Sequence, residues 1–278
     1  MRLATRLRRL GMGLATVTGV GRAGFFVPYR HAGAVRPRGY PALLPRLAAA
    51  EPRFEQVLAM VREWAATLRE MRGPAPEPRW DQDWFPGLDG AAAYAIVRGL
   101  GPRRILEIGS GHSTRFMARA VRDRGRPGAI TCIDPAPRAN LDGLDVRHVP
   151  RLLDDAPGSL FDELAPGDVL FIDSSHIAMP GTDVDRLFGD LLPRLAPGAL
   201  VHVHDVFLPD DYPDAWRWRG YNEQLPVACL LQGNGYAPIF ASRYLRTRRP
   251  EWLRAAAIDG LPIPAGAFET SLWLEKLG

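Results

Sequence analysis

The chain has 278 residues, 46% of them hydrophobic and 24% charged, which is the balance of a globular protein with a sizeable core. Its two cysteines stand far from any Cys/His cluster, which argues against a zinc site or a disulfide framework and favours a reducing, cytoplasmic location. The net charge of +4 is uneven, because residues 1–50 hold nine arginines and no acid, so the remainder carries −5. That basic segment lacks interleaved aromatic residues, so we expect no nucleic-acid partner.

Residues 1–50 are expected to form a basic and apolar N-terminal arm. Residues 10–27 are largely apolar, but five glycines and Arg22 interrupt them, which fits neither a membrane span nor a cleaved signal. A helical arm is favoured, and peripheral contact with an anionic lipid surface stays open. The aromatic segment 24–30 is expected to anchor the arm to the body or to a subunit partner, and the latter would give a homo-oligomer.

Residues 51–78 are predicted to form an amphipathic helix, Pro52–Arg72, followed by a Pro/Gly-rich linker. The linker, residues 73–78, marks the expected boundary of a third segment that runs from 79 to 278. At its start we predict a helix that is capped by Asp89 and ends near Leu100. This helix precedes the first predicted strand, and it could bring Tyr94 near a ligand.

Beyond residue 100, short apolar runs alternate with helical patterns, as in an α/β, Rossmann-like doubly wound sheet. The predicted strands are 105–108, 129–133, 146–149, 168–172, 199–203, 237–241 and 271–275. The predicted helices between them lie near 159–164, 183–195 and 222–231.

The first of these strands runs into a glycine turn at residues 109–111. Glycine lets the backbone turn sharply and lets a ligand lie against it. Ser113 or Thr114 is expected to cap the helix that follows. Thr114 also stands where a dinucleotide fingerprint has its third small residue, and the carboxylate of Glu107 would repel a pyrophosphate. The turn therefore suits a ligand with a cationic amine.

Acidic residues stand at the carboxyl ends of four predicted strands: Glu107, Asp134, Asp173 and Asp205. In an open α/β sheet, ligands bind along this edge. Asp134 follows Gly109 by 25 residues, about the spacing at which an acid holds the ribose hydroxyls of a nucleotide cofactor. We therefore expect one crevice lined by carboxylates.

Two motifs carry a family resemblance, which covers roughly residues 84–275. The Glu-x-Gly-x-Gly turn resembles motif I of the class I S-adenosylmethionine-dependent methyltransferases. Asp173-Ser-Ser-His176, together with His204-Asp205, resembles the metal-assisted O-methyltransferase branch, most closely the macrocin and cephalosporin-hydroxylase-like group. The resemblance implies a seven-stranded sheet with an antiparallel last strand, and methyl transfer to a hydroxyl of a small molecule or glycoside.

The same resemblance implies site residues. Asp173 and His176 would be catalytic, with His176 as the base. A divalent cation, Mg²⁺ or Mn²⁺, would bind Asp173 and Asp205. His204 departs from the family, which usually has an acid there; it is the third candidate ligand, although imidazole is a poor magnesium ligand and a site without metal stays open. The residues expected to bind S-adenosylmethionine are Glu107, Gly109, Ser110, Gly111, Ser113, Asp134, Asp173 and Tyr94.

An aromatic-rich loop follows the fifth predicted strand, where α/β enzymes often keep acceptor specificity. It contains the expected acceptor residues Trp216, Trp218, Tyr221 and Asn222, and a dimerisation surface is an equal alternative. Two other functions stay open. One is an NAD(P)-dependent oxidoreductase, and the other is a non-catalytic, cofactor-binding or membrane-associated scaffold.

Overall fold

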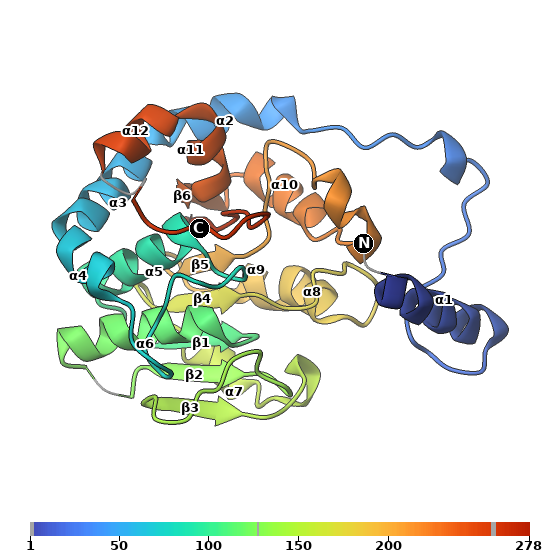
Figure 1. Ribbon diagram of the computed structural model, residues 1–278, viewed down its shortest axis with the longest axis horizontal. Coiled ribbons are helices and arrows are strands. Elements are labelled where there is room, and N and C mark those ends of the chain that lie inside the picture. Colours follow the sequence, from blue (N-terminus) through green and yellow to red (C-terminus); the bar gives the residue numbers. More distant parts are fainter. Residues whose placement is uncertain (1–2, 127, 257–259) are drawn as a thin grey trace.

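A computed structural model describes residues 3–126, 128–256 and 260–278, and it contains one seven-stranded sheet (Figure 1). The strand order is β3-β2-β1-β4-β5-β7-β6, and β7 is antiparallel to both of its neighbours. The predicted fold class, with its antiparallel last strand, is confirmed. The strands are β1 Ile105–Ile108, β2 Ile130–Ile133, β3 Val146–Val149, β4 Val169–Ile172, β5 Leu200–Val203, β6 Tyr236–Ala241 and β7 Leu272–Lys276.

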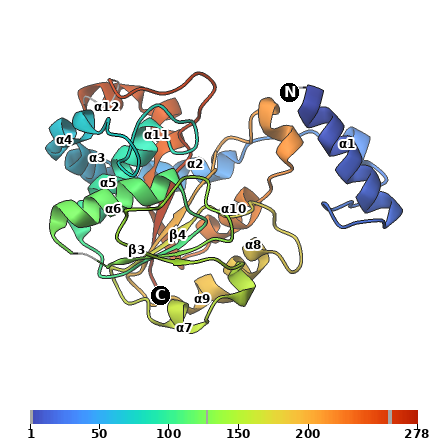
Figure 2. The same ribbon diagram turned by 60° about the horizontal axis from the view of Figure 1, so that its bottom comes forward.

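Helices cover both faces of this sheet (Figure 2). One layer consists of α3 Glu51–Glu63, α4 Ala65–Glu70, α5 Gly87–Leu100, α6 His112–Arg124, α11 Ser242–Arg248 and α12 Pro250–Ala255. The opposite face carries α7 Ser159–Asp162, α8 Asp183–Arg186 and α9 Leu192–Arg194. Near the sheet edge formed by β6 lie α2 Leu44–Ala49 and α10 Gln224–Gln232, and α1 Leu3–Thr18 stands apart. The helix predicted over 183–195 forms, but a π-helical turn at Leu187–Leu191 joins its halves.

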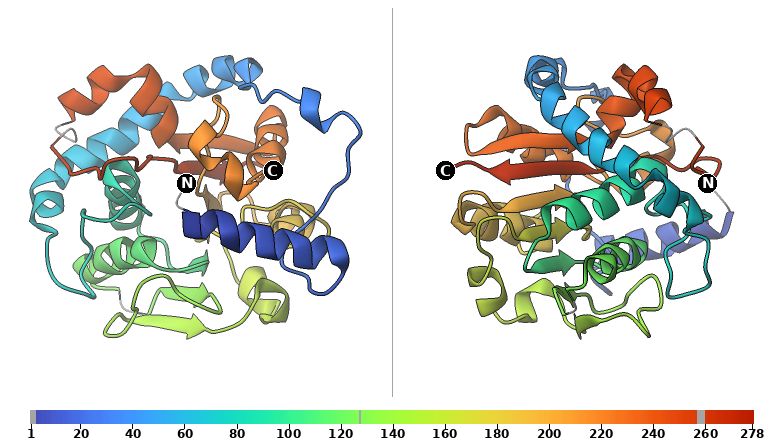
Figure 3. Two further views of the ribbon diagram at one scale, coloured as in Figure 1. Left: turned by 45° about the vertical axis from the view of Figure 1, so that its right-hand side comes forward. Right: turned by 90° about the vertical axis from the view of Figure 1, so that its left-hand side faces the viewer.

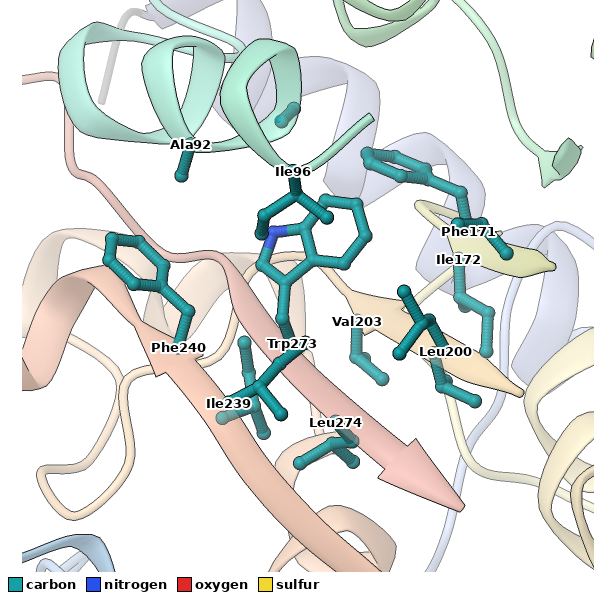
Figure 4. Packing of buried hydrophobic residues seen from close by; sticks show 14 of the residues in the cluster. Ala92, Ile96, Phe171, Ile172, Leu200, Val203, Ile239, Phe240, Trp273 and Leu274 are labelled. Carbon is teal, nitrogen blue, oxygen red and sulfur yellow. The ribbon is translucent and has the colours of Figure 1, made fainter. Parts of the chain in front are cut away.

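The core between the first layer and the sheet is built around Trp273 of β7, which is fully buried (Figure 4). Its ring lies among Ile96 of α5, Phe171 of β4 and Phe240 of β6. Phe171 meets it edge to face, with 5.9 Å between ring centroids. Strands buried on both faces are typical of a sheet covered by helices on both sides, which explains why the first predicted strands are continuous apolar runs.

Asp89 does not cap α5, contrary to the prediction, because the helix begins at Gly87 after Pro86. The carboxylate is instead fully buried, and it accepts hydrogen bonds from the Ser242 hydroxyl and from the backbone N–H groups of Thr270 and Ser271. Burial raises the pKa of Asp89 to about 6. Asp89 therefore holds the two ends of the insertion between β6 and β7 against α5.

The amphipathic helix predicted over Pro52–Arg72 is present but interrupted. It ends as α3 and resumes as α4, because Trp64 leaves the helical conformation with φ −106° and ψ 19°. The apolar face of α3 packs on α5 and β6. In the linker, Glu77 forms ion pairs with Arg119 and Arg122 of α6.

The first part of the N-terminal arm, residues 3–30, contains no buried residue. No residue of α1 is buried, and Phe25 and Phe26 are 58% and 64% exposed. The prediction that segment 24–30 anchors the arm to the body is therefore wrong, and the alternative of a subunit partner stays a prediction. Within the described residues, no helix is long and apolar enough to span a bilayer.

Candidate active site

The glycine turn after β1 brings the ends of β1 and β4 into contact. Gly109 has φ +78°, and a Cβ atom at this position would overlap the carbonyl oxygen of Asp173. Only glycine combines this left-handed conformation with such a close approach. The turn also directs Ser110 toward the end of β2, where its N–H and hydroxyl donate to Asp134 Oδ2 over 2.7 and 3.0 Å.

The start of α6 differs from the predicted cap. Gly111 is the N-cap, and its N–H donates to Thr114 Oγ1. The hydroxyls of Ser113 and Thr114 donate in turn to Glu107, over 2.6 and 2.7 Å. Glu107 is fully buried, and burial raises its pKa to about 7. Both of its oxygens are engaged, so Glu107 holds α6 on β1 and does not face a ligand.

Replacing Glu107 with glutamine should flatten the pH dependence of stability. The folded pKa is raised above the ordinary 4.5, so the stabilising contribution of the bound proton is complete below pH 4.5 and is lost as the pH rises through 7. From about pH 5 to pH 8 the wild type should lose on the order of 2 kcal/mol more than Glu107→Gln, as measured by urea unfolding. Glu70→Gln, at an exposed site, is the control. If the free energy of unfolding of the wild type and of Glu107→Gln depended on pH in the same way, this account would be contradicted.

A cavity of about 500 Å³ opens at the carboxyl edge of β1, β2, β3 and β4. Four carboxylates and two guanidinium groups line it, belonging to Asp134, Asp154, Asp173, Asp183, Arg138 and Arg151. Of the residues predicted to bind the cofactor, Gly109, Ser110, Asp134 and Asp173 are in its wall. Glu107, Gly111 and Ser113 do not line the cavity. The carboxylate-lined crevice is present with Asp134 and Asp173, but two of the four acids expected there, Glu107 and Asp205, do not line it.

Tyr94 does not reach this cavity. Its hydroxyl donates to Asp123 Oδ2 over 2.7 Å and contacts Arg98, and its ring meets that of Trp64 edge to face. Arg98 is on α5, Asp123 is on α6 and Trp64 lies between α3 and α4, and none of them lines the cavity. Tyr94 therefore joins the helices of one layer, and the structure gives it no contact with a ligand in the crevice.

The imidazole of His176 lies among three carboxylates. Its Nδ1 is 2.8 Å from Glu223 Oε2, and its Nε2 is 3.2 Å from Asp173 Oδ1 and 3.4 Å from Asp205 Oδ2. The ring is 1% exposed and packs against Tyr221, with 4.6 Å between centroids. Among the described residues, His176 and Asp205 are the two non-glycine residues with positive φ, 61° and 55°. Such strained conformations gather at functional sites.

These contacts change the chemistry expected of His176. Burial lowers the pKa of the imidazole, but its hydrogen bonds with Asp173 and Glu223 and the charge of Asp205 outweigh burial and raise the pKa well above 6.5. At neutral pH the side chain is therefore an imidazolium, which cannot accept a proton. The geometry thus does not support the predicted base, and it makes His176 a cationic partner that positions Asp173.

The predicted metal site does not fit this arrangement. The imidazole of His176 fills the space between Asp173 and Asp205. His204 Nε2 lies 2.9 Å from the Trp84 carbonyl oxygen and donates to it, so that nitrogen has no free lone pair for an ion. In the described ranges no group of three His, Cys, Asp or Glu side chains could hold an ion.

The predicted acceptor residues separate into two pairs. Tyr221 and Asn222 border a second cavity of about 710 Å³, formed with residues 35–43 of the N-terminal arm. Trp216 instead packs on Phe207, and Trp218 is 40% exposed. Because Tyr221 contacts His176, a chain of contacts connects the second cavity to Asp173 and the first cavity.

Several residues of the site were not predicted. Glu223, the Nδ1 partner of His176, is a single acid before an apolar helix, a pattern that carries no signal of pairing. Leu152 and Leu153 line the first cavity just after β3. The rule that ligands bind at the carboxyl ends of parallel strands could have identified them, because it applies to β3 as it does to β1 and β2.

Comparison with known proteins bears on the part of the chain that carries this crevice. Residues 106–206, which are 101 of the 278, match the family described as "Methyltransferase domain". This stretch, from β1 to just past β5, is therefore similar to methyltransferase domains. No curated protein is similar enough to match.

Among solved structures, similar chains include a Podospora anserina methyltransferase bound to SAH, with 19% identity, 92% of this chain and 100% of that chain covered, and a TM-score of 0.42. An O-methyltransferase from Bacillus cereus in complex with SAH is 16% identical, with 82% of this chain and 91% of that chain covered, and has a TM-score of 0.40. A branched-chain polyamine synthase from Thermus thermophilus is 17% identical, with 78% of this chain and 63% of that chain covered, and has a TM-score of 0.38. These similarities are too distant to assign an activity.

Proposed function

We propose that this chain transfers a methyl group from S-adenosylmethionine to a hydroxyl of a small molecule or glycoside. The observation that carries the proposal is the charge of the first cavity, where four carboxylates outnumber two guanidinium groups. S-adenosylmethionine carries a sulfonium and an amine against one carboxylate, so it is a net cation. Its size suits a cavity of about 500 Å³, within the usual range of ligand pockets.

The donor would lie along the ends of β1, β2 and β3. Asp134 suits the ribose hydroxyls, because it borders the cavity and its Oδ1, which accepts one hydrogen bond from the Ala136 N–H, can accept another. The turn at Gly109 and Ser110, beside Asp173, suits the methionine end with its cationic amine. An oxidoreductase is less favoured, because the pyrophosphate of NAD(P) would meet the carboxylates of Asp134 and Asp173 at close range.

Methyl transfer from a sulfonium is an in-line displacement with a donor that is already activated. The protein must mainly align acceptor oxygen, methyl carbon and sulfur, and such orientation is worth up to about 7–11 kcal/mol. Asp173 is one of the four carboxylates that line the cavity; burial raises the pKa of its carboxyl, but the charge of His204 and the hydrogen bond with His176 outweigh burial and hold the pKa below its ordinary range. It is the group proposed to accept the hydrogen bond of the acceptor hydroxyl and to take its proton as the bond from oxygen to methyl carbon forms and the bond from methyl carbon to sulfur breaks. His176 would position Asp173, and Tyr221 and Asn222 would contact parts of the acceptor remote from the reacting oxygen.

We propose an oxygen atom as the methyl acceptor, and similarity to the macrocin and cephalosporin-hydroxylase-like group, because Asp173 and His176 follow β4 and Asp205 follows β5. We propose it without the metal of that group, since the His176 imidazole fills the space between Asp173 and Asp205 and the Nε2 of His204 is engaged by the Trp84 carbonyl oxygen. The acceptor is therefore expected to react without added divalent cation, and EDTA should leave turnover unchanged.

Replacing Asp134 with alanine should weaken binding of S-adenosylhomocysteine by about 10–100-fold, because hydrogen bonds to a charged group contribute about 1.5–3 kcal/mol. Isothermal titration calorimetry measures this directly. Asp142→Ala removes the same charge from an exposed turn outside the cavity and should bind like the wild type. If Asp134→Ala bound with unchanged affinity, Asp134 would not hold the donor, and the proposed position of the ribose would be wrong.

A further inference from the structure

The helix α1 exposes a continuous apolar stripe. The stripe residues follow one another at steps of four and three, which places them on one face of a helix. Each of them is between 57% and 71% exposed, and they are Leu3, Leu7, Leu10, Leu14 and Val17. A monomeric protein rarely leaves such a patch uncovered, so the stripe indicates a binding surface.

A second apolar group follows directly after α1. Its side chains are between 58% and 86% exposed, and they are Val20, Phe25, Phe26, Val27 and Tyr29. Arginines lie around both groups, including Arg6 and Arg8 on α1 and Arg22 and Arg30 after it, all of them exposed. Because residues 1–50 contain no acid, no carboxylate in the arm neutralises this charge.

We propose that residues 3–30 bind the surface of an anionic lipid bilayer. Leucine and phenylalanine side chains would enter the boundary between headgroups and acyl chains, while the arginines contact anionic headgroups, as in interfacial amphipathic helices. A membrane span is not involved, because α1 has 16 residues and no described helix meets the length and hydropathy of a span.

The charge of the arm favours lipid over a second copy of the chain. Two arms would bring arginine against arginine with no acid between them. The stripe also covers only about two heptads, fewer than the three or four that indicate a stable coiled coil. An anionic bilayer presents the opposite charge and needs no matching helix.

The arm is joined to the body beside the candidate site. The N–H of Tyr40 donates to the carbonyl oxygen of Pro209, in the loop after β5, over 2.6 Å, and Leu43 and Leu47 are buried. From there α1 lies on the side toward which β2 and β3 point, in front of the body in the rotated view (Figures 1 and 3). Binding of α1 to a bilayer would therefore turn the carboxyl edge of the sheet, with both cavities, toward the membrane.

Vesicle co-sedimentation of the full chain tests the proposal. We expect binding to phosphatidylcholine vesicles that contain phosphatidylglycerol to be at least about tenfold tighter than binding to phosphatidylcholine alone, and to weaken in high salt. Leu7→Asp/Leu14→Asp should remove most of this binding, since it places two charges in the apolar stripe. Arg6→Gln/Arg8→Gln should weaken it about tenfold or more, and only for the anionic vesicles.

Matched variants on the body provide the controls. Leu100→Asp/Leu277→Asp changes two leucines that are each 50% exposed, and Arg194→Gln/Arg217→Gln changes two exposed arginines outside the arm. Both should bind vesicles like the wild type. Equal binding to both kinds of vesicle, or full binding by Leu7→Asp/Leu14→Asp, would overturn the proposal. If the wild type self-associated but did not bind vesicles, and Leu7→Asp/Leu14→Asp abolished the self-association, the stripe would instead bind a second copy of the chain.

Discussion

The variant His176→Ala should lose about 3–5 kcal/mol of unfolding free energy, the cost of removing one partner from a buried charge pair. The reason is the environment of the ring. The substitution leaves the carboxylates of Asp173, Asp205 and Glu223 close together without the cation that they share. Urea unfolding at neutral pH measures the loss, and calorimetry should show weaker S-adenosylhomocysteine binding as well, because Asp173 borders the donor cavity.

A second variant separates charge from packing. In His176→Ala/Glu223→Gln, one of the three stranded carboxylates is neutral, so part of the lost stability should return. His31→Ala, at an exposed position of the arm, should change little. If the double variant were less stable than His176→Ala, the ring would act by filling space, and the assignment of an imidazolium would fail.

Gly109→Ala should abolish donor binding. It should also lower the free energy of unfolding by more than the cost of placing alanine in a left-handed backbone conformation. An alanine at φ +78° costs about 1–2 kcal/mol for the left-handed conformation. Its Cβ would also overlap the carbonyl oxygen of Asp173, so the ends of β1 and β4 must separate. Overpacking of this kind adds about 1–3 kcal/mol. Thermal unfolding and calorimetry with S-adenosylhomocysteine measure the two effects.

Gly125→Ala is the matched control for this prediction. Gly125, at the end of α6, has φ +74° but no atom within 4 Å of the position of a Cβ. Gly125→Ala should therefore have the same conformational cost as Gly109→Ala but no steric overlap, and it should leave donor affinity unchanged. Equal losses in the two variants would mean that the contact between the turn and Asp173 does not shape the cavity.

Much of the fold could be predicted because its signals are local. β1 and β3 were predicted with their observed bounds, since each is a short stretch between turn signals with a β-branched residue at both ends. The helix capped by Asp89 was misassigned at its start because Asp89 finds its partners in residues 242, 270 and 271, more than 150 positions away. Spacing along the chain holds no information about such contacts.

In the candidate site, too, the features with local signals could be predicted and those that depend on distant residues could not. Asp134 and Asp173 were placed correctly at one edge, because the carboxyl ends of parallel strands always meet there. The role of Glu107 was not predictable, since the hydroxyls that engage it belong to a helix whose rotation on β1 is set by packing. His176 was found, but its charge state depends on Glu223, which lies 47 residues further on.

The central claim is that the crevice at the carboxyl edge of β1, β2 and β4 binds a cationic methyl donor. Titration of the unmodified chain with S-adenosylmethionine and, separately, with NAD⁺ in a calorimeter tests it most directly. We predict one saturable site for S-adenosylmethionine and no heat from NAD⁺. Saturable binding of NAD⁺, with none for S-adenosylmethionine, would contradict the account.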